Sequence, residues 1–141
     1  MMNKYAMSLI PLSLVMVLSM ASCKKYEEGP AISLTSRSER VANTWTIDRA
    51  IADGNDVTSD YDNYVLTLTA GGSATLVATY TVFGVNFTGE TNGTWAFQND
   101  DEELVLDFEN DDADGTYQIR RLTEAELWIH KIGDDLELRL K

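Results

Sequence analysis

The feature that most constrains the fold is an alternation of apolar and polar residues that runs from Trp45 to the C-terminus. The apolar members of the clearest runs are Tyr64, Leu66, Leu68; Leu104, Leu106, Phe108; Tyr117, Ile119; Leu127, Ile129; and Leu136, Leu138, Leu140. A period of two is typical of β-strands with one buried face, and helical spacing fits these runs less well. The alternation therefore predicts an all-β domain.

Turn-forming residues separate the runs at intervals of about 8 to 12 residues, which favours about eight or nine short antiparallel strands. Turns are predicted at residues 70–72, 83–84, 90–93, 98–101, 111–115 and 133–134. Large apolar side chains such as Trp45, Ile47 and Leu66 are too numerous for one solvated sheet. Curling of the meander into a small up-and-down barrel or half-barrel buries them and removes most exposed edges. Before the first strand, Ser36 or Ser38 can cap a short helical turn.

The N-terminal segment predicts a bacterial lipoprotein signal peptide over residues 1–22. Lys4 precedes an apolar run over residues 6–18, and Met20-Ala21-Ser22-Cys23 fits the lipobox pattern. The apolar run is shorter than the roughly 20 residues that a spanning helix needs. We expect the Cys23 thiol to carry the lipid, palmitate among its acyl chains, and to anchor the protein in the outer membrane. Whether the protein faces the periplasm or the cell surface is left open.

Domain organisation and charge follow from the same sequence. Residues 23–36 are predicted to be a lipidated, flexible tether, and residues 37–141 the folded domain. The chain carries 23 acidic and 11 basic residues, a net charge of −12, which excludes a nucleic-acid partner because phosphate backbones require a basic footprint. Cys23 is the only cysteine, so lipidation leaves neither a disulfide nor a thiol nucleophile.

Three short motifs carry a resemblance to a known family. They are Asn43-Thr44-Trp45, Gly93-Thr94-Trp95, and the late segment Tyr117 to Thr123 followed by Glu126-Leu127-Trp128-Ile129. Their order, from about Glu39 to Lys141, resembles the lipocalin-like domains of Gram-negative lipoproteins. The resemblance implies a barrel whose first tryptophan, Trp45, closes one end beneath an arginine from a late strand. Arg121 and Arg139 are the candidates for that arginine.

Catalysis finds little support in the residue pattern. His130 is the only histidine, it lies on a predicted strand, and no serine or aspartate motif stands beside it. The acidic residues cluster in turns such as 100–103, where they are expected to be solvated. We expect neither enzymatic activity nor a cofactor.

The segment from Asn110 to Gly115 is similar to the opening of a calcium-binding loop. Asn110, Asp112 and Asp114 provide oxygens at alternate positions, but position 12 of such a loop is Arg121 rather than a glutamate. A polar hairpin loop without a metal is therefore expected.

Two function classes remain, both of them binding functions. In the favoured one, the interior is filled, as in small barrels, and an outward patch at Trp128 and His130 binds another envelope protein. In the alternative, the barrel carries a small apolar ligand at its mouth. The residues predicted to line that mouth are Tyr64, Tyr80, Trp95, Phe97 and Tyr117. The inward face of residues 76–83 is not determined by their pattern, since both alternating sets are apolar enough. The face of the strand with Trp128 is also left open: if Leu127 and Ile129 point inward, Trp128 points outward, and the reverse register would place Trp128 in the core.

Overall fold

The computed structural model describes residues 34–141, except for the side chains of Tyr80, Thr81, Val82 and Phe87. The predicted signal peptide, Cys23 and residues 23–33 of the predicted tether lie outside the described residues. Across residues 34–141, no helix is long and apolar enough to cross a membrane.

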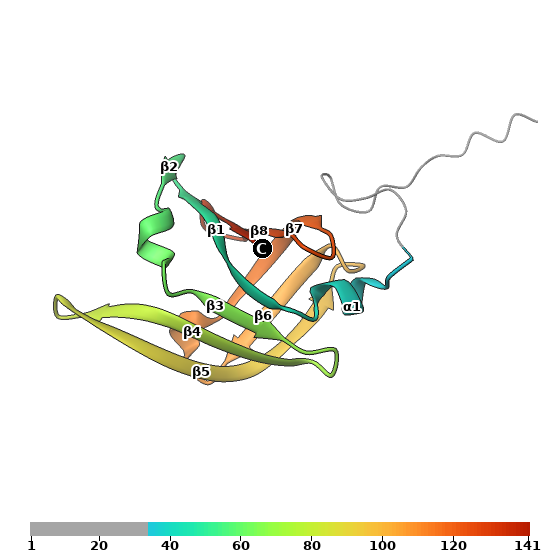
Figure 1. Ribbon diagram of the computed structural model, residues 1–141, viewed down its shortest axis with the longest axis horizontal. Coiled ribbons are helices and arrows are strands. Elements are labelled where there is room, and N and C mark those ends of the chain that lie inside the picture. The colour runs from blue at the N-terminus through green and yellow to red at the C-terminus, as the bar shows by residue number, and fades with distance from the viewer. Residues whose placement is uncertain (1–33) are drawn as a thin grey trace, which may run out of the picture.

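The described chain is a short helix followed by an antiparallel meander, so the predicted all-β class is confirmed (Figure 1). The helical elements are α1 (Arg37–Val41) and the 3-10 turns η1 (Thr58–Tyr61) and η2 (Asp111–Ala113). The strands are β1 (Thr44–Ala52), β2 (Asn55–Asp56), β3 (Val65–Leu68), β4 (Ser73–Val82), β5 (Val85–Gln98), β6 (Glu103–Phe108), β7 (Gly115–Leu122), β8 (Leu127–Lys131) and β9 (Leu136–Leu140).

The sheet closes on itself because β1 pairs with β3 on one side and with β9 on the other. The closing register joins Ile47 to Leu140 and Ala52 to Leu136, with a bulge between Ile47 and Arg49. β2 is a two-residue hairpin partner of β1, so the other eight strands form the barrel. Closure leaves the barrel strands without the long open edges that an unrolled meander would have.

The core follows the alternation along each strand. On β6, for example, Leu104, Leu106 and Phe108 are buried while the residues between them are partly or fully exposed. On β8, Leu127 and Ile129 are buried, which turns Trp128 and His130 to the outer face as expected. On β4, the face left open by the sequence is settled at Ala74 and Leu76, which are buried.

One end of the barrel is closed by α1 and the first tryptophan. Ser36 caps α1 as predicted: its hydroxyl accepts a hydrogen bond from the Glu39 amide, and the Glu39 carboxylate accepts one from the Ser36 amide. Trp45 is fully buried, and its Nε1 donates to the Val41 carbonyl oxygen at 2.9 Å. The Arg40 guanidinium donates to the Leu122 carbonyl oxygen at 2.9 Å, which ties α1 to β7.

The predicted turn at residues 90–93 is wrong, because β5 runs through this segment without interruption from Val85 to Gln98. Gly93 acts here as a packing residue. A Cβ at this position would overlap the Asp107 carbonyl group and lie 2.6 Å from the Phe108 Cα. Glycine therefore allows β5 and β6 to approach closely inside a strand, and its presence does not mark a chain reversal.

Candidate functional site

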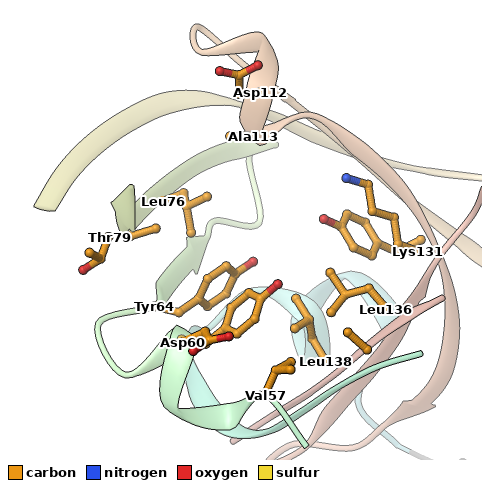
Figure 2. Close-up of a pocket in the computed structure, with 14 residues that line it drawn as sticks. Val57, Asp60, Tyr64, Leu76, Thr79, Asp112, Ala113, Lys131, Leu136 and Leu138 are labelled. Carbon is orange, nitrogen blue, oxygen red and sulfur yellow. The ribbon is translucent and has the colours of Figure 1, made fainter. Parts of the chain in front are cut away.

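The barrel is open at the end opposite α1, where a cavity of about 410 Å³ lies among the strand ends (Figure 2). It is lined by Ala52, Val57, Asp60, Tyr61, Tyr64, Leu76, Ala78, Thr79, Asp112, Ala113, Tyr117, Lys131, Leu136 and Leu138. This volume falls within the range of small-molecule sites. The expectation of a filled interior therefore holds at the Trp45 end and is corrected at the mouth.

Each barrel strand that contributes to the cavity does so near the mouth. β1 contributes its last residue, Ala52, while β8 and β9 contribute Lys131 and Leu136 on either side of their turn. The end of β1 is linked to the start of β3 by β2 and η1, which add a short wall beside the opening (Figure 1). The cavity is thus a product of barrel closure, because its walls come from segments far apart in the sequence.

Three tyrosines give the cavity its polar chemistry. The rings of Tyr61 and Tyr64 lie 6.0 Å apart at 60°, and Tyr117 is buried on the wall formed by β7. Burial, followed by the nearby Tyr61 and Asp134, raises the pKa of Tyr117 to about 12. Burial also raises the pKa of Tyr61, with Asp60 and Asp134 adding to the effect. These phenols keep their protons at neutral pH and can donate hydrogen bonds.

The aliphatic and charged residues occupy different parts of the site. Figure 2 shows Tyr64, Leu76, Leu136 and Leu138 directed toward a common space, with Asp112 set apart from them. Apart from the phenols and Thr79, the polar lining comes from Asp60, Asp112 and Lys131. The arrangement suits an apolar molecule that carries a polar group at one end.

The predicted lining residues divide between the two ends of the barrel. Tyr64 and Tyr117 line the cavity, whereas Trp95 and Phe97 do not. Trp95 instead donates from Nε1 to the Thr69 carbonyl oxygen at 2.7 Å and packs edge-on against Phe97, with centroids 5.2 Å apart. The alternation predicts the inward face of a residue but not its height along the barrel. The Tyr80 side chain lies outside the described part of the structure.

The cavity lining also includes residues that the sequence did not predict. Val57 precedes η1, and Tyr61 is the last residue of η1, a segment without strand periodicity. Lys131 is the last residue of β8. Their only sequence signal is proximity to predicted turns. Which turns gather at one mouth depends on how the strands pair.

The outer face holds a second arrangement, centred on Trp128. The guanidinium carbons of Arg139 and Arg121 lie 4.2 Å and 5.3 Å from the centroid of this indole. The prediction that one of these arginines covers Trp45 is therefore wrong. Both arginines point to the outer face because the residues beside them, Leu122, Leu138 and Leu140, occupy the inner one.

A groove of about 470 Å³ runs beside Trp128. Its lining includes His130, whose Nε2 lies 3.4 Å from an Asp135 carboxylate oxygen, and Arg139, whose Nε donates to Glu137 at 2.7 Å. The predicted patch residues Trp128 and His130 thus share one groove. Both of them are only partly exposed.

In the loop from Asn110 to Gly115, two side-chain oxygens accept hydrogen bonds from nearby backbone amides. The Asp114 carboxylate accepts a hydrogen bond from the Phe108 amide at 2.6 Å, and the Asn110 side chain accepts one from the Asp112 amide at 3.2 Å. Within residues 34–141, no three histidine, cysteine, aspartate or glutamate side chains are placed to hold a metal ion.

The fold and site define a small up-and-down barrel whose sheet is closed by the pairing of β1 with β9 and whose interior is open at one end. No protein-family model matches the chain, and no curated protein matches it in sequence. A solved DUF4847 family protein from Bacteroides vulgatus is similar with a TM-score of 0.46 and 13% identity, over 72% of this chain and 92% of that one. The odorant binding protein OBP1 is similar with a TM-score of 0.42 and 12% identity, over 75% of this chain and 71% of that one.

Proposed function

We propose that this protein is a lipid-anchored, non-catalytic binding protein of the bacterial cell envelope that carries a small apolar molecule in the mouth of its barrel. The observation that carries the proposal is the cavity of about 410 Å³ at the end opposite α1. Its walls are mainly tyrosine rings and aliphatic side chains, and burial of such a ligand supplies the main driving force for binding.

The cavity chemistry narrows the class of ligand. Protonated phenols at Tyr61 and Tyr117 offer hydrogen-bond donors inside an otherwise apolar space. Asp60 and Asp112 oppose a strongly anionic ligand, while the ammonium group of Lys131 offers one counter-charge. A neutral or weakly polar molecule with a hydrogen-bond acceptor fits this lining.

Attachment to the outer membrane through a lipid on Cys23 is the second part of the proposal. The lipobox at Met20 to Cys23 supports lipidation and attachment to the outer membrane. Two or three acyl chains on Cys23 give stable attachment and leave the barrel in water.

The outer groove supports partner binding as a second candidate function. It brings Trp128 and His130 together, as predicted for an interaction patch. Two arginines already occupy the space over the Trp128 ring, however, and their carboxylate partners Glu126 and Glu137 balance their charge. The mouth cavity therefore has the stronger claim.

Ligand binding can be measured on the mature chain from residue 23 carrying Cys23→Ser. An uncharged, environment-sensitive probe such as N-phenyl-1-naphthylamine should gain fluorescence on binding. Ala78 lines the cavity, so Ala78→Phe should fill it and weaken probe binding by at least about tenfold, the effect of a lost contact near 1.4 kcal/mol.

Ala96→Phe is the matched control, because Ala96 is exposed on β5 and does not line the cavity. It should bind the probe like the parent chain. Equal binding by the parent and Ala78→Phe, or no binding by either, would contradict the proposal. If the parent chain binds the probe and Ala78→Phe does not, native mass spectrometry of the protein purified from its own envelope would identify a retained ligand.

A further inference from the structure

The β4–β5 hairpin extends past the body of the barrel. Pairing of β3 with β4 ends at Val65 and Val77, and pairing of β5 with β6 begins at Gly93 and Phe108. Between these limits the two arms of the hairpin pair with each other, and Figure 1 shows them projecting beyond η1. Ala78 and Thr79 line the cavity, so the hairpin rises from the rim of the mouth.

The tip of this hairpin presents apolar side chains to water. Val82 and Val85 pair across a two-residue loop of Phe83 and Gly84, both with positive φ, at 49° and 78°. Phe83 is fully exposed and Val85 is 54% exposed. Loops of this type favour Asn-Gly, and a bulky residue at positive φ is uncommon. Neither the turn geometry nor core packing accounts for a phenylalanine at this position.

The tip belongs to a long uncharged stretch in an otherwise acidic chain. Residues 63–89 contain no aspartate, glutamate, lysine or arginine, although the whole chain has 34 such residues. Exposed strand edges are usually protected by charge or proline, and the arms have neither between residues 78 and 89, although Glu90 follows at the base of β5. A surface that lacks charge and ends in an aromatic residue is suited to a nonpolar environment.

A further exposed apolar residue lies at the same end of the molecule. Ile132 follows β8 in the turn to β9, between the cavity-lining residues Lys131 and Leu136, and is 49% exposed. Of the four exposed large hydrophobic residues in the described part of the chain, Phe83, Val85 and Ile132 are therefore at the mouth end. Leu34 is the exception and precedes α1.

We infer that the β4–β5 tip, with Ile132, docks the mouth of the barrel onto the surface of a zwitterionic lipid bilayer. Phe83 and Val85 enter the interfacial layer, and residues 78–89, which carry no charge, follow without a large cost of desolvating charges. Acidic residues at the mouth, including Asp60 and Asp112, repel anionic lipids. Docking is thus hydrophobic, and anionic lipid weakens it.

The expected lipid anchor is compatible with this orientation. Ser36, the cap of α1, lies 13 positions after Cys23. A chain of that length spans at most about 47 Å, comparable with the length of a 14-residue strand such as β5. The barrel can therefore turn its mouth toward the bilayer that holds the lipid. The docking surface does not require the cavity to contain a ligand.

Vesicle binding by the mature chain carrying Cys23→Ser tests the inference without the anchor. The chain should sediment with sucrose-loaded phosphatidylcholine vesicles, and addition of phosphatidylglycerol at low ionic strength should reduce the bound fraction. Phe83→Asn supplies the residue that the turn prefers, so the fold is retained. It should lower the partition coefficient by about tenfold or more, because a buried phenylalanine contributes about that much.

Leu34→Asn is the matched control, since Leu34 is as exposed as Phe83 but lies at the opposite end. It should sediment like the parent chain, and both variants should bind the naphthylamine probe equally in the absence of vesicles. Failure of the parent to sediment, or equal sedimentation after Phe83→Asn, would overturn the inference. A dimer detected by light scattering and lost in Phe83→Asn would overturn it in favour of docking between copies of the chain.

Discussion

Trp45 joins the helix, the first strand and the core through one side chain. It is fully buried, and its Nε1 donates to the carbonyl oxygen of Val41. Trp45→Ala should therefore lower the free energy of unfolding by about 3 to 5 kcal/mol, through the cavity left by the indole. Urea denaturation followed by circular dichroism measures the change. Trp45→Phe should lose less, and an alanine variant as stable as the parent would contradict this assignment.

Trp128 lies beneath two arginines, one of which the sequence predicted to lie over Trp45. The structure turns it outward, which settles the register that the sequence left open, and places two guanidinium groups over its ring. Trp128→Ala should cost about 1 to 2 kcal/mol, because both cation–π contacts are lost with part of the packing. Arg139→Gln should account for a portion of this loss. Denaturation of both single variants and the double variant would measure the coupling, and independent effects would contradict the arrangement.

Tyr117 links the cavity to a dependence of stability on pH. Its pKa in the folded protein is about 12, against an ordinary value of 10.0. The folded state thus retains the proton more tightly, so the corresponding stability is fully present below pH 10 and is lost as pH rises toward 12. The free energy of unfolding should fall across this window and fall less steeply in Tyr117→Phe. Identical pH profiles for the two proteins would show that Tyr117 is not the source.

At the scale of elements, β5 depends on one glycine inside a long strand. Gly93→Ala would drive a methyl group into the β6 backbone at Asp107 and Phe108. The free energy of unfolding should fall by more than about 2 kcal/mol, because backbone cannot yield as a side chain does. Gly71→Ala is the control, since its nearest neighbour, the Thr69 hydroxyl, lies at an ordinary 3.9 Å. Equal stabilities in urea would show that β5 and β6 can separate at this point.

At the scale of the whole molecule, the proposed lipid anchor depends on Cys23. Cys23→Ser in the full chain should block acylation and either lower the membrane-bound fraction of the protein or leave an uncleaved precursor. Fractionation and labelling with a palmitate analogue measure this outcome. Labelling of the serine variant to the level of the parent would contradict lipidation at Cys23.

The sequence by itself determined the all-β class, most of the turns and much of the inward face. Alternation at positions such as Leu104, Leu106 and Phe108 predicted which side chains enter the core, because successive residues of a strand point to opposite faces. Ser36 likewise marked the start of α1 through the local hydrogen bonds of its side chain. These are short-range effects that a single stretch of chain contains.

Tertiary structure decided what depends on several strands at once. Closure of β1 against β9 placed Tyr64 and Tyr117 at one mouth and left Trp95 at the other end. Gly93 resembles a turn residue in the sequence, and only its close contact with the β6 backbone explains why a glycine is needed there. Height along a barrel, and the space left at its mouth, follow from the register of nonlocal strand pairs. That register is set by the joint packing of all the strands, which no local pattern encodes.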